Sequence, residues 1–317
     1  MPDGVESGRV DASWRGLAWP ALRPSAYRLA MLLTPRYNGP DVLRIEVPLG
    51  DPSIPLVRQR RRLGQTLSAL AEGDWSVPSR CESWSVQDVV AHLVSTNQFW
   101  TLSISSALAG SPTRFLESFD PVATPAALVE PTRGLSPSAV LAQYTESVDG
   151  LAAAVTGLSD EAWSLPAEAP PGHIALRAVA LHALWDAWTH ERDIMLPLGL
   201  TQAAEPDEIL GSLVYAAAIG PALLATCGST RVGTLSVEAD DPSIAFVVEA
   251  GPTVVVREPS AGDAGGAGVG AGADAELRGQ AVDLIEGLTF RAPLAHGVAA
   301  EHQWLLGGLD QAFDLVS

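Results

Sequence analysis

Cysteine and basic residues are scarce in this sequence. Its two cysteines, Cys81 and Cys227, cannot build a disulfide framework or an all-cysteine metal cluster, and they fit a reducing cytoplasm. Lysine and arginine total 19 against 37 acidic residues, which gives a formal net charge of −18. Nonspecific nucleic-acid binding and attraction to anionic membranes both require a basic surface. The composition therefore argues against both, and an anionic small ligand would need a local cationic pocket.

Signals for export, membrane insertion and nucleotide binding are also missing. The first residues lack the basic start and apolar run of a signal peptide, so we expect a cytoplasmic protein. Residues 209–230 are uncharged and long enough to span a bilayer, but their glycines, Pro221 and acidic flank favour a buried core helix. No Walker A motif, strand-linked G-x-G-x-x-G or G-x-S-x-G motif is present, so nucleotide binding and hydrolase-elbow chemistry have no support.

Hydrophobic periodicity separates a helical part of the chain from a later part rich in strands. Helical spacing predicts helices at about 55–70, 85–109, 137–157, 174–196 and 206–227, with a long proline-containing loop at 110–134. Ser85 and Asp88 form a variant of the capping box at the start of the second helix. After Gly228, alternating segments predict a small antiparallel sheet. A flexible low-complexity loop follows at 260–275, and short helices are expected at about 280–288 and 299–313.

The pattern predicts three segments. Residues 1–53 are interpreted as an N-terminal tail or extension, with one short strand in the segment VLRIEVPL. Residues 54–228 are expected to form a bundle of four helices plus a fifth. Residues 229–317 are expected to form a small α+β domain.

Side chains that can bind a metal recur on one face of the predicted fourth helix. His182, Asp186 and His190 are four residues apart and project from the same face. Burying such groups in an apolar segment is costly without a partner. His92 lies on the second helix, which is also apolar. If these helices face each other, two histidines and a carboxylate can meet at one divalent cation with an open coordination position, which is typical of catalytic zinc sites.

Helix geometry limits which residues can share one ion. His182 and His190 lie roughly 12 Å apart along the helix axis. Metal–ligand bonds are only about 2 Å long. Either the Asp186–His190 pair or the His182–Asp186 pair therefore joins His92, and the remaining histidine or Asp193 can hydrogen-bond a ligand. The alternative interpretation is structural, with the histidines satisfied by core neighbours and Asp186 paired to Arg192 or Arg177.

Two segments resemble a known family. CESWSVQDVVAHL, residues 81–93, resembles the C-x-G-W-[ST]-V-x-D-[LV]-x-x-H-L signature of the mycothiol-dependent maleylpyruvate isomerase family, a branch of the DinB-like four-helix bundles. LWDAWTHERDIMLPLG, residues 184–199, resembles the family's E-x-x-x-H-x-x-D segment. The resemblance covers about residues 56–200, and residues 229–317 resemble the sterol-carrier-like domain that often follows. It implies a DinB-like up-down bundle followed by a small α+β domain.

The resemblance also implies a site. His92, Asp186 and His190 would bind zinc or another divalent metal, and mycothiol would be the cosubstrate whose thiol attacks an electrophilic small molecule. Arg291, in GLTFRAPL, matches an arginine implicated in catalysis through binding the anionic substrate or thiol; the alternative for it is a surface salt bridge. The chain departs from the family at Asp186, where the family has glutamate, and at Ser83, where it has glycine.

Three other side chains near these segments are interpreted separately. Cys81 is interpreted as a buried, inert thiol rather than a nucleophile. His182 and Trp185 are extra features that could line a different substrate pocket.

Three functions are compatible with these residues. The leading expectation is a cytoplasmic, metal-dependent thiol transferase or isomerase that acts on an electrophilic small molecule with mycothiol or a similar low-molecular-weight thiol. A non-catalytic binding or regulatory protein on the same bundle is a second possibility, motivated by the change from glutamate to aspartate. A metal-dependent hydrolase is the third. No nucleic-acid or membrane partner is expected, and the sequence leaves a homodimer open.

Overall fold

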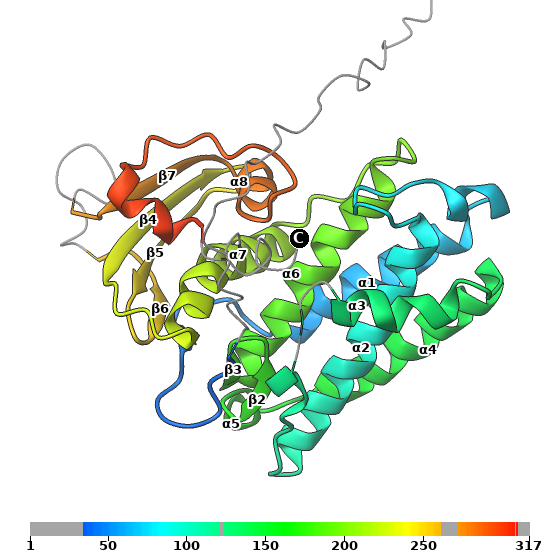
Figure 1. The fold of residues 1–317 in the computed structure, drawn as a ribbon, viewed down its shortest axis with the longest axis horizontal. Coiled ribbons are helices and arrows are strands. Elements are labelled where there is room, and N and C mark those ends of the chain that lie inside the picture. The colour runs from blue at the N-terminus through cyan, green and yellow to red at the C-terminus, as the bar shows by residue number, and fades with distance from the viewer. Residues whose placement is uncertain (1–33, 119, 121–122, 261–271, 308, 310–317) are drawn as a thin grey trace, which may run out of the picture. The chain divides into compact units, whose positions relative to one another are not determined.

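The computed structural model describes residues 34–118, 120, 123–260, 272–307 and 309 (Figure 1). The described residues all belong to one compact unit. The predictions for residues 1–33, for most of the low-complexity loop and for the end of the last helix lie outside the described residues.

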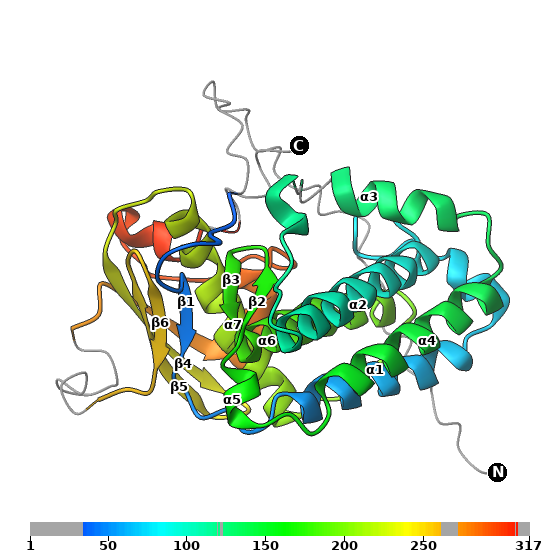
Figure 2. The ribbon, with the colours of Figure 1, turned by 90° about the horizontal axis from the view of Figure 1, so that it is seen from below.

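Four long helices form the predicted bundle. They are α1 (Ser53–Ser68), α2 (Val86–Leu108), α4 (Pro137–Val155) and α6 (Leu176–Met195), and each lies within a few residues of its prediction. Helix α2 packs on α4 and α6, and α1 packs on the same two helices (Figure 2). Leu63, Val90, Leu93 and Tyr144 are at most 1% exposed in the core between them.

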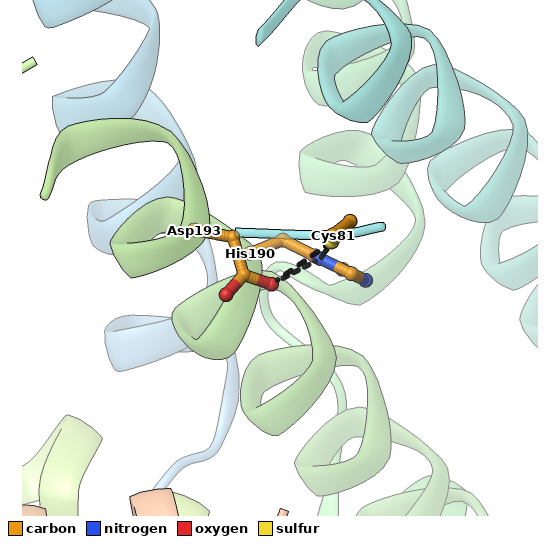
Figure 3. A group of neighbouring side chains, drawn as sticks. All are labelled: Cys81, His190 and Asp193. Atoms are coloured by element: carbon orange, nitrogen blue, oxygen red, sulfur yellow. Dashed lines mark hydrogen bonds and ion pairs between the residues drawn. The ribbon is translucent and has the colours of Figure 1, made fainter. Parts of the chain in front are cut away.

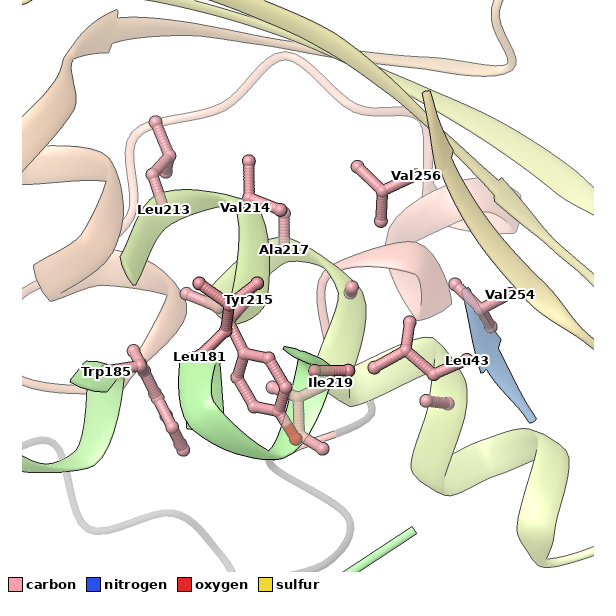
Figure 4. Close-up of a cluster of buried hydrophobic side chains, with 14 of the residues drawn as sticks. Leu43, Leu181, Trp185, Leu213, Val214, Tyr215, Ala217, Ile219, Val254 and Val256 are labelled. Carbon is pink, nitrogen blue, oxygen red and sulfur yellow. The ribbon is translucent and has the colours of Figure 1, made fainter. Parts of the chain in front are cut away.

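The fifth predicted helix, α7 (Pro206–Thr226), is the central core helix. It is long and apolar enough to cross a membrane by length and composition, but 89% of that window is buried inside the protein. It packs on α6, on two strands of the sheet and on α8 (Ala281–Leu288). Figure 4 shows Leu213, Val214 and Ile219 of α7 in one apolar cluster with side chains from α6 and from the sheet. The bundle and the sheet thus share this helix.

The five-stranded sheet is mixed. Its order is β1-β6-β5-β4-β7, with β1 (Leu43–Ile45), β4 (Gly233–Asp240), β5 (Ile244–Ala250), β6 (Val254–Arg257) and β7 (Ala275–Gln280). The three central strands are antiparallel, as expected from their short turns, but β1 and β7 run parallel to β6 and β4. Strand β1 precedes the bundle in the chain and β7 follows a long connection, so hairpin geometry constrains neither strand.

Several short elements were not predicted. Strands β2 (Pro166–Ala169) and β3 (Gly172–Ala175) form a hairpin before α6. At Gly172, which has a φ of 117°, a Cβ would lie 2.1 Å from the Arg36 carbonyl oxygen, so only glycine fits there. The expected 110–134 loop contains α3 (Ala123–Val129) and two 3-10 turns, Phe115–Ser118 and Glu130–Thr132. The other unpredicted short helices are α5 (Asp160–Trp163) and the 3-10 helix Glu72–Ser76. The 3-10 helix Ala300–Leu305, in contrast, lies within the helix predicted at about 299–313.

Candidate metal centre

The local sequence fixes where α2 begins and therefore where His92 lies. Ser85 Oγ accepts a hydrogen bond from the Asp88 amide at 3.2 Å, and Asp88 Oδ2 accepts one from the Ser85 amide at 2.9 Å. This is the predicted capping box. Just before it, Ser83 has a φ of 63°, in the left-handed region that favours glycine, which is the residue in the signature this segment resembles.

His92, Asp186 and His190 come together between α2 and α6. The Nε2 atoms of His92 and His190 lie 4.0 Å and 3.6 Å from Asp186 Oδ1. One ligand atom from each of the three residues lies within 4.8 Å of the others. The side chains of the three residues are only 11–17% exposed. This is one of the two ligand sets that helix geometry allowed, and its binding of a metal stays a prediction.

The structure separates His182 from this group and contradicts the structural interpretation of Asp186. His182 Nδ1 lies 2.7 Å from the hydroxyl of Tyr215 on α7. The two arginines considered as partners of Asp186 bind elsewhere: Arg192 donates to Glu286 at 2.6 Å and Arg177 to Asp160 at 3.3 Å.

The donor set fits a divalent cation. Asp186 Oδ2 and His92 Nδ1 are buried and have no hydrogen-bond partner among the described residues. Burial would raise the pKa of Asp186, but His92 and His190 lower it more strongly, to well below its usual range. A buried carboxylate that stays ionised with an unpaired oxygen is costly, and a bound cation would offset that cost. Two imidazoles and one carboxylate are ligands that zinc accepts.

A second group of side chains lies on the other side of the His190 ring. Asp193 Oδ2 is 3.0 Å from His190 Nδ1 and 3.2 Å from Cys81 Sγ, which is itself 3.6 Å from that nitrogen. Figure 3 shows the other ring nitrogen of His190 pointing away from Asp193 and Cys81. Asp193 therefore hydrogen-bonds Nδ1 of His190, as expected for a residue that supports a metal-binding side chain. Nε2 of His190 is left facing Asp186.

Cys81 and Arg80 were not predicted to belong to the site. The Cys81 thiol is half-buried rather than fully buried, and it lies against His190 and Asp193. Burial lowers the pKa of His190, but Cys81, Asp193 and Asp186 raise it more, to about 10. The sequence signal for Cys81 was its place at the start of the CESW segment. No pattern in that segment indicates a contact with α6.

Arg291 lies on a buried carboxylate rather than in a surface salt bridge. Its Nε and Nη2 atoms donate to Asp193 at 2.8–3.1 Å, and the Asp193 side chain is 0% exposed. Burial would raise the pKa of Asp193, but His190 and Arg291 lower it well below its usual range. The guanidinium already neutralises Asp193, which disfavours a second cation at Cys81, His190 and Asp193 although their atoms are close enough.

Comparisons with known proteins place the helical part of the chain and its fold. Residues 56–195 match the sequence family described as Mycothiol maleylpyruvate isomerase N-terminal domain. Two solved structures, one of a mycothiol-dependent maleylpyruvate isomerase and one of its histidine-to-alanine mutant, are each similar with a TM-score of 0.54 and 16% sequence identity. Each match covers 78% of this chain and 90% of the other, and at this identity it shows the fold alone. No curated protein matches the chain significantly in sequence.

Proposed function

We propose that this chain is a metal-dependent thiol transferase or isomerase, because residues 56–195 match the mycothiol maleylpyruvate isomerase N-terminal domain family. Its cosubstrate would be mycothiol or a similar low-molecular-weight thiol, and its substrate an electrophilic small molecule. The observation that carries the proposal is the meeting of His92, Asp186 and His190. The histidine Nε2 atoms face one carboxylate oxygen of Asp186, and its other oxygen is buried without a hydrogen-bond partner among the described residues. The scarcity of cysteine leads us to place the reaction in the cytoplasm.

Each residue of the site has a physical role in this proposal. A divalent ion held by His92, Asp186 and His190 would favour the thiolate form of a bound thiol. Asp193 accepts the hydrogen bond from His190 Nδ1–H, which keeps Nε2 turned toward Asp186, where it would bind the ion once its own proton is displaced. Arg291 holds Asp193 in place through its two hydrogen-bonded nitrogens.

The charge around Asp193 favours an anionic ligand. Arg80, Arg192 and Arg291 bring three positive charges, and their carboxylate partners Asp193 and Glu286 bring two negative charges. Among these five residues the positive charges exceed the negative ones by one. The Arg291 side chain is 26% exposed, so part of it is free to contact a carboxylate of the thiol or substrate.

Metal content is the first test. Elemental mass spectrometry of purified protein is expected to find about one divalent ion per chain, absent from His92→Ala and Asp186→Ala variants. His296→Ala, which removes a histidine from the loop that follows α8, is the matched control and should keep its metal. A wild-type protein that takes up no zinc on incubation would contradict the proposal in favour of a non-catalytic binding protein.

The requirement for thiol is the second test. The metal-loaded enzyme should convert electrophilic substrates only when thiol is present. Ester or amide turnover that is unchanged when thiol is omitted would instead identify a metal-dependent hydrolase, in which the metal activates water.

A further inference from the structure

Arg60 on α1 is a buried charge without an opposite charge beside it. The residue is 1% exposed, and its guanidinium makes no ion pair with any residue that the structure describes. Arg58 and Arg62 on the same helix are more exposed, at 35% and 21% of their side chains, yet both pair with Glu208. An uncompensated charge in a protein core is costly. Arg60 therefore calls for an explanation that its exposed neighbours do not need.

Hydrogen bonds satisfy the Arg60 guanidinium but leave its charge in place. Nε donates to Asn97 Oδ1 at 2.7 Å, and Nη2 donates to the Ala183 carbonyl oxygen at 2.8 Å. Nη1 lies 3.4 Å from the Leu56 carbonyl oxygen. All three acceptors are neutral, and arginine does not lose its proton in proteins. A full positive charge is therefore held inside the bundle.

Two of these acceptors belong to the helices that carry the candidate metal ligands. Helix α1 packs on α4 and α6 rather than on α2, so Arg60 reaches across the centre of the bundle to Asn97 (Figure 2). Asn97 follows His92 on α2, and Ala183 precedes Asp186 on α6 by about one helical turn. Helical side chains tilt toward the N-terminus of their helix. The Asp186 carboxylate therefore leans toward the turn that Arg60 contacts.

The electrostatics agree with this placement. Burial lowers the pKa of Arg60, whereas Tyr144 and Asp186 raise it. Burial raises the pKa of Tyr144, so at neutral pH Asp186 is the charged one of these two neighbours. Arg291, in contrast, is paired directly with Asp193. Arg60 is thus an unpaired positive charge whose field reaches a candidate ligand.

That field adds to the charge of the metal centre. A divalent ion held by one carboxylate and two neutral imidazoles keeps a net positive charge at its open position. A buried charge is screened by salt much less than a charge at the surface. With an effective dielectric constant of about 20 and a separation of about 10 Å, a unit charge changes the affinity for an anion by about tenfold.

We propose that the buried charge of Arg60 makes the candidate metal centre select an anionic ligand, such as a thiolate, over a neutral one at its open position. This inference rests on the proposed function and deepens it by naming a residue that sets the charge of the ligand. Arg60 acts through its field and touches none of the three candidate ligands. An Arg60 that only joined α1 to α2 and α6 would affect anionic and neutral ligands alike.

The test compares an anionic and a neutral ligand on the loaded protein. The full chain is loaded with Co²⁺, whose visible absorption changes when a ligand binds, and is titrated at pH 8 with thiocyanate and with imidazole. Arg60→Gln keeps a side-chain N–H donor but removes the charge. We expect it to bind thiocyanate about tenfold more weakly than the wild type and to bind imidazole with unchanged affinity. Equal changes for the two ligands, or no change in either, would overturn the proposal.

Two further variants complete the comparison. Arg61→Gln is the matched control, because Arg61 is the next residue of α1 and is exposed, so both affinities should equal those of the wild type. Arg60→Met covers the case in which Arg60→Gln does not fold, since an apolar side chain often replaces a buried charge without loss of stability. It should show the same selective loss of thiocyanate affinity. Full thiocyanate affinity in Arg60→Met would overturn the proposal.

Cobalt uptake separates this inference from the proposed function. A wild-type chain that binds no cobalt would overturn the metal-dependent function and the role of Arg60 together. A wild-type chain that binds cobalt, with Arg60 variants whose preference between thiocyanate and imidazole is unchanged, would overturn the role of Arg60 alone. The metal-dependent function would then stand without it.

Discussion

His190 is the residue at which the two halves of the candidate site meet. Its Nε2 faces Asp186 and His92, and its Nδ1 contacts Asp193 and Cys81. Helical spacing predicted the Asp186–His190 pair because residues four apart share a helix face. Spacing could not choose between His190 and His182, because both are one turn from Asp186. The choice depends on which residues α2 and α7 bring to each histidine, and that is a tertiary property.

Metal binding at His190 should displace a proton. The pKa of His190, raised to about 10, keeps the ring protonated at pH 7, whereas burial lowers that of His92. A metal at Nε2 must therefore remove one proton from His190, and zinc affinity should rise about tenfold per pH unit between pH 6 and 8. Calorimetric titration in two buffers of different ionisation enthalpy measures the proton count. A zinc affinity that is independent of pH would contradict this assignment.

Asp193 should contribute to both stability and metal affinity. In Asp193→Asn the amide oxygen can still accept from His190, but the Arg291 charge loses its buried partner. Removing one partner of such a pair should lower the free energy of unfolding by about 3 kcal/mol. Loss of the charged acceptor behind His190 should weaken zinc binding about tenfold. Urea unfolding and competition with a chromogenic chelator measure the two effects.

The control for this substitution lies at the surface. Asp160 is 93% exposed and pairs with Arg177, so Asp160→Asn should change the free energy of unfolding by less than about 0.5 kcal/mol. If Asp193→Asn were equally mild, the buried pair with Arg291 would not be a significant part of the site's stability.

At the scale of elements, the long helices could be predicted and the short ones could not. Helices α2 and α4 begin at Ser85 and Ser136, whose side chains cap them, and such caps are visible in the sequence. The hairpin β2–β3 has strands of four residues around Pro170 and Pro171, too short for an alternating pattern. It depends on contact with Arg36, more than a hundred residues away, and sequence reasoning has no access to such a contact.

The N-terminal cap of α2 should contribute measurably to the free energy of unfolding. Ser85→Ala removes the acceptor for the Asp88 amide and should lower the free energy of unfolding by about 1 kcal/mol. Ser105→Ala makes the same substitution at an exposed position inside the same helix, where alanine's higher helix propensity should leave stability unchanged or slightly raised. Urea unfolding followed by circular dichroism compares them. Equal losses of unfolding free energy in the two variants would show that the Ser85 cap does not stabilise α2.

At the scale of the whole molecule, an ionic network fastens α8 to the bundle beside the candidate site. Glu286 on α8 accepts hydrogen bonds from Arg80, which precedes α2, and from Arg192 on α6. Arg80 also donates to the Arg291 carbonyl at 3.0 Å. Arg80, Arg192 and Glu286 are separated from one another by about a hundred positions or more, and no sequence pattern indicates that they pair. The network explains why Arg291, far from the metal-binding helices in sequence, lies against Asp193.

Glu286→Gln tests that network through its pH dependence. Burial raises the pKa of Glu286, but Arg80 and Arg192 lower it more strongly, so the folded protein favours the ionised carboxylate. A carboxyl group with a lowered folded-state pKa contributes stability above its unfolded pKa of about 4.3 and loses it as the pH falls through the folded value. Glu286→Gln should therefore cost about 2 kcal/mol at pH 7 and progressively less below about pH 4.

A second glutamate serves as the control that shows whether the charge of Glu286 causes the loss of stability. Glu276 on β7 is 44% exposed and pairs with Arg278 at 3.5 Å, so Glu276→Gln should change stability by less than about 0.5 kcal/mol at any pH. Urea unfolding of both variants and the wild type, at pH 7 and at pH 3.5, gives the difference directly. A loss in Glu286→Gln that is as large at pH 3.5 as at pH 7 would mean that Glu286 acts by packing. Arg80 and Arg192 would then hold α8 to the bundle by contacts other than the ion pair.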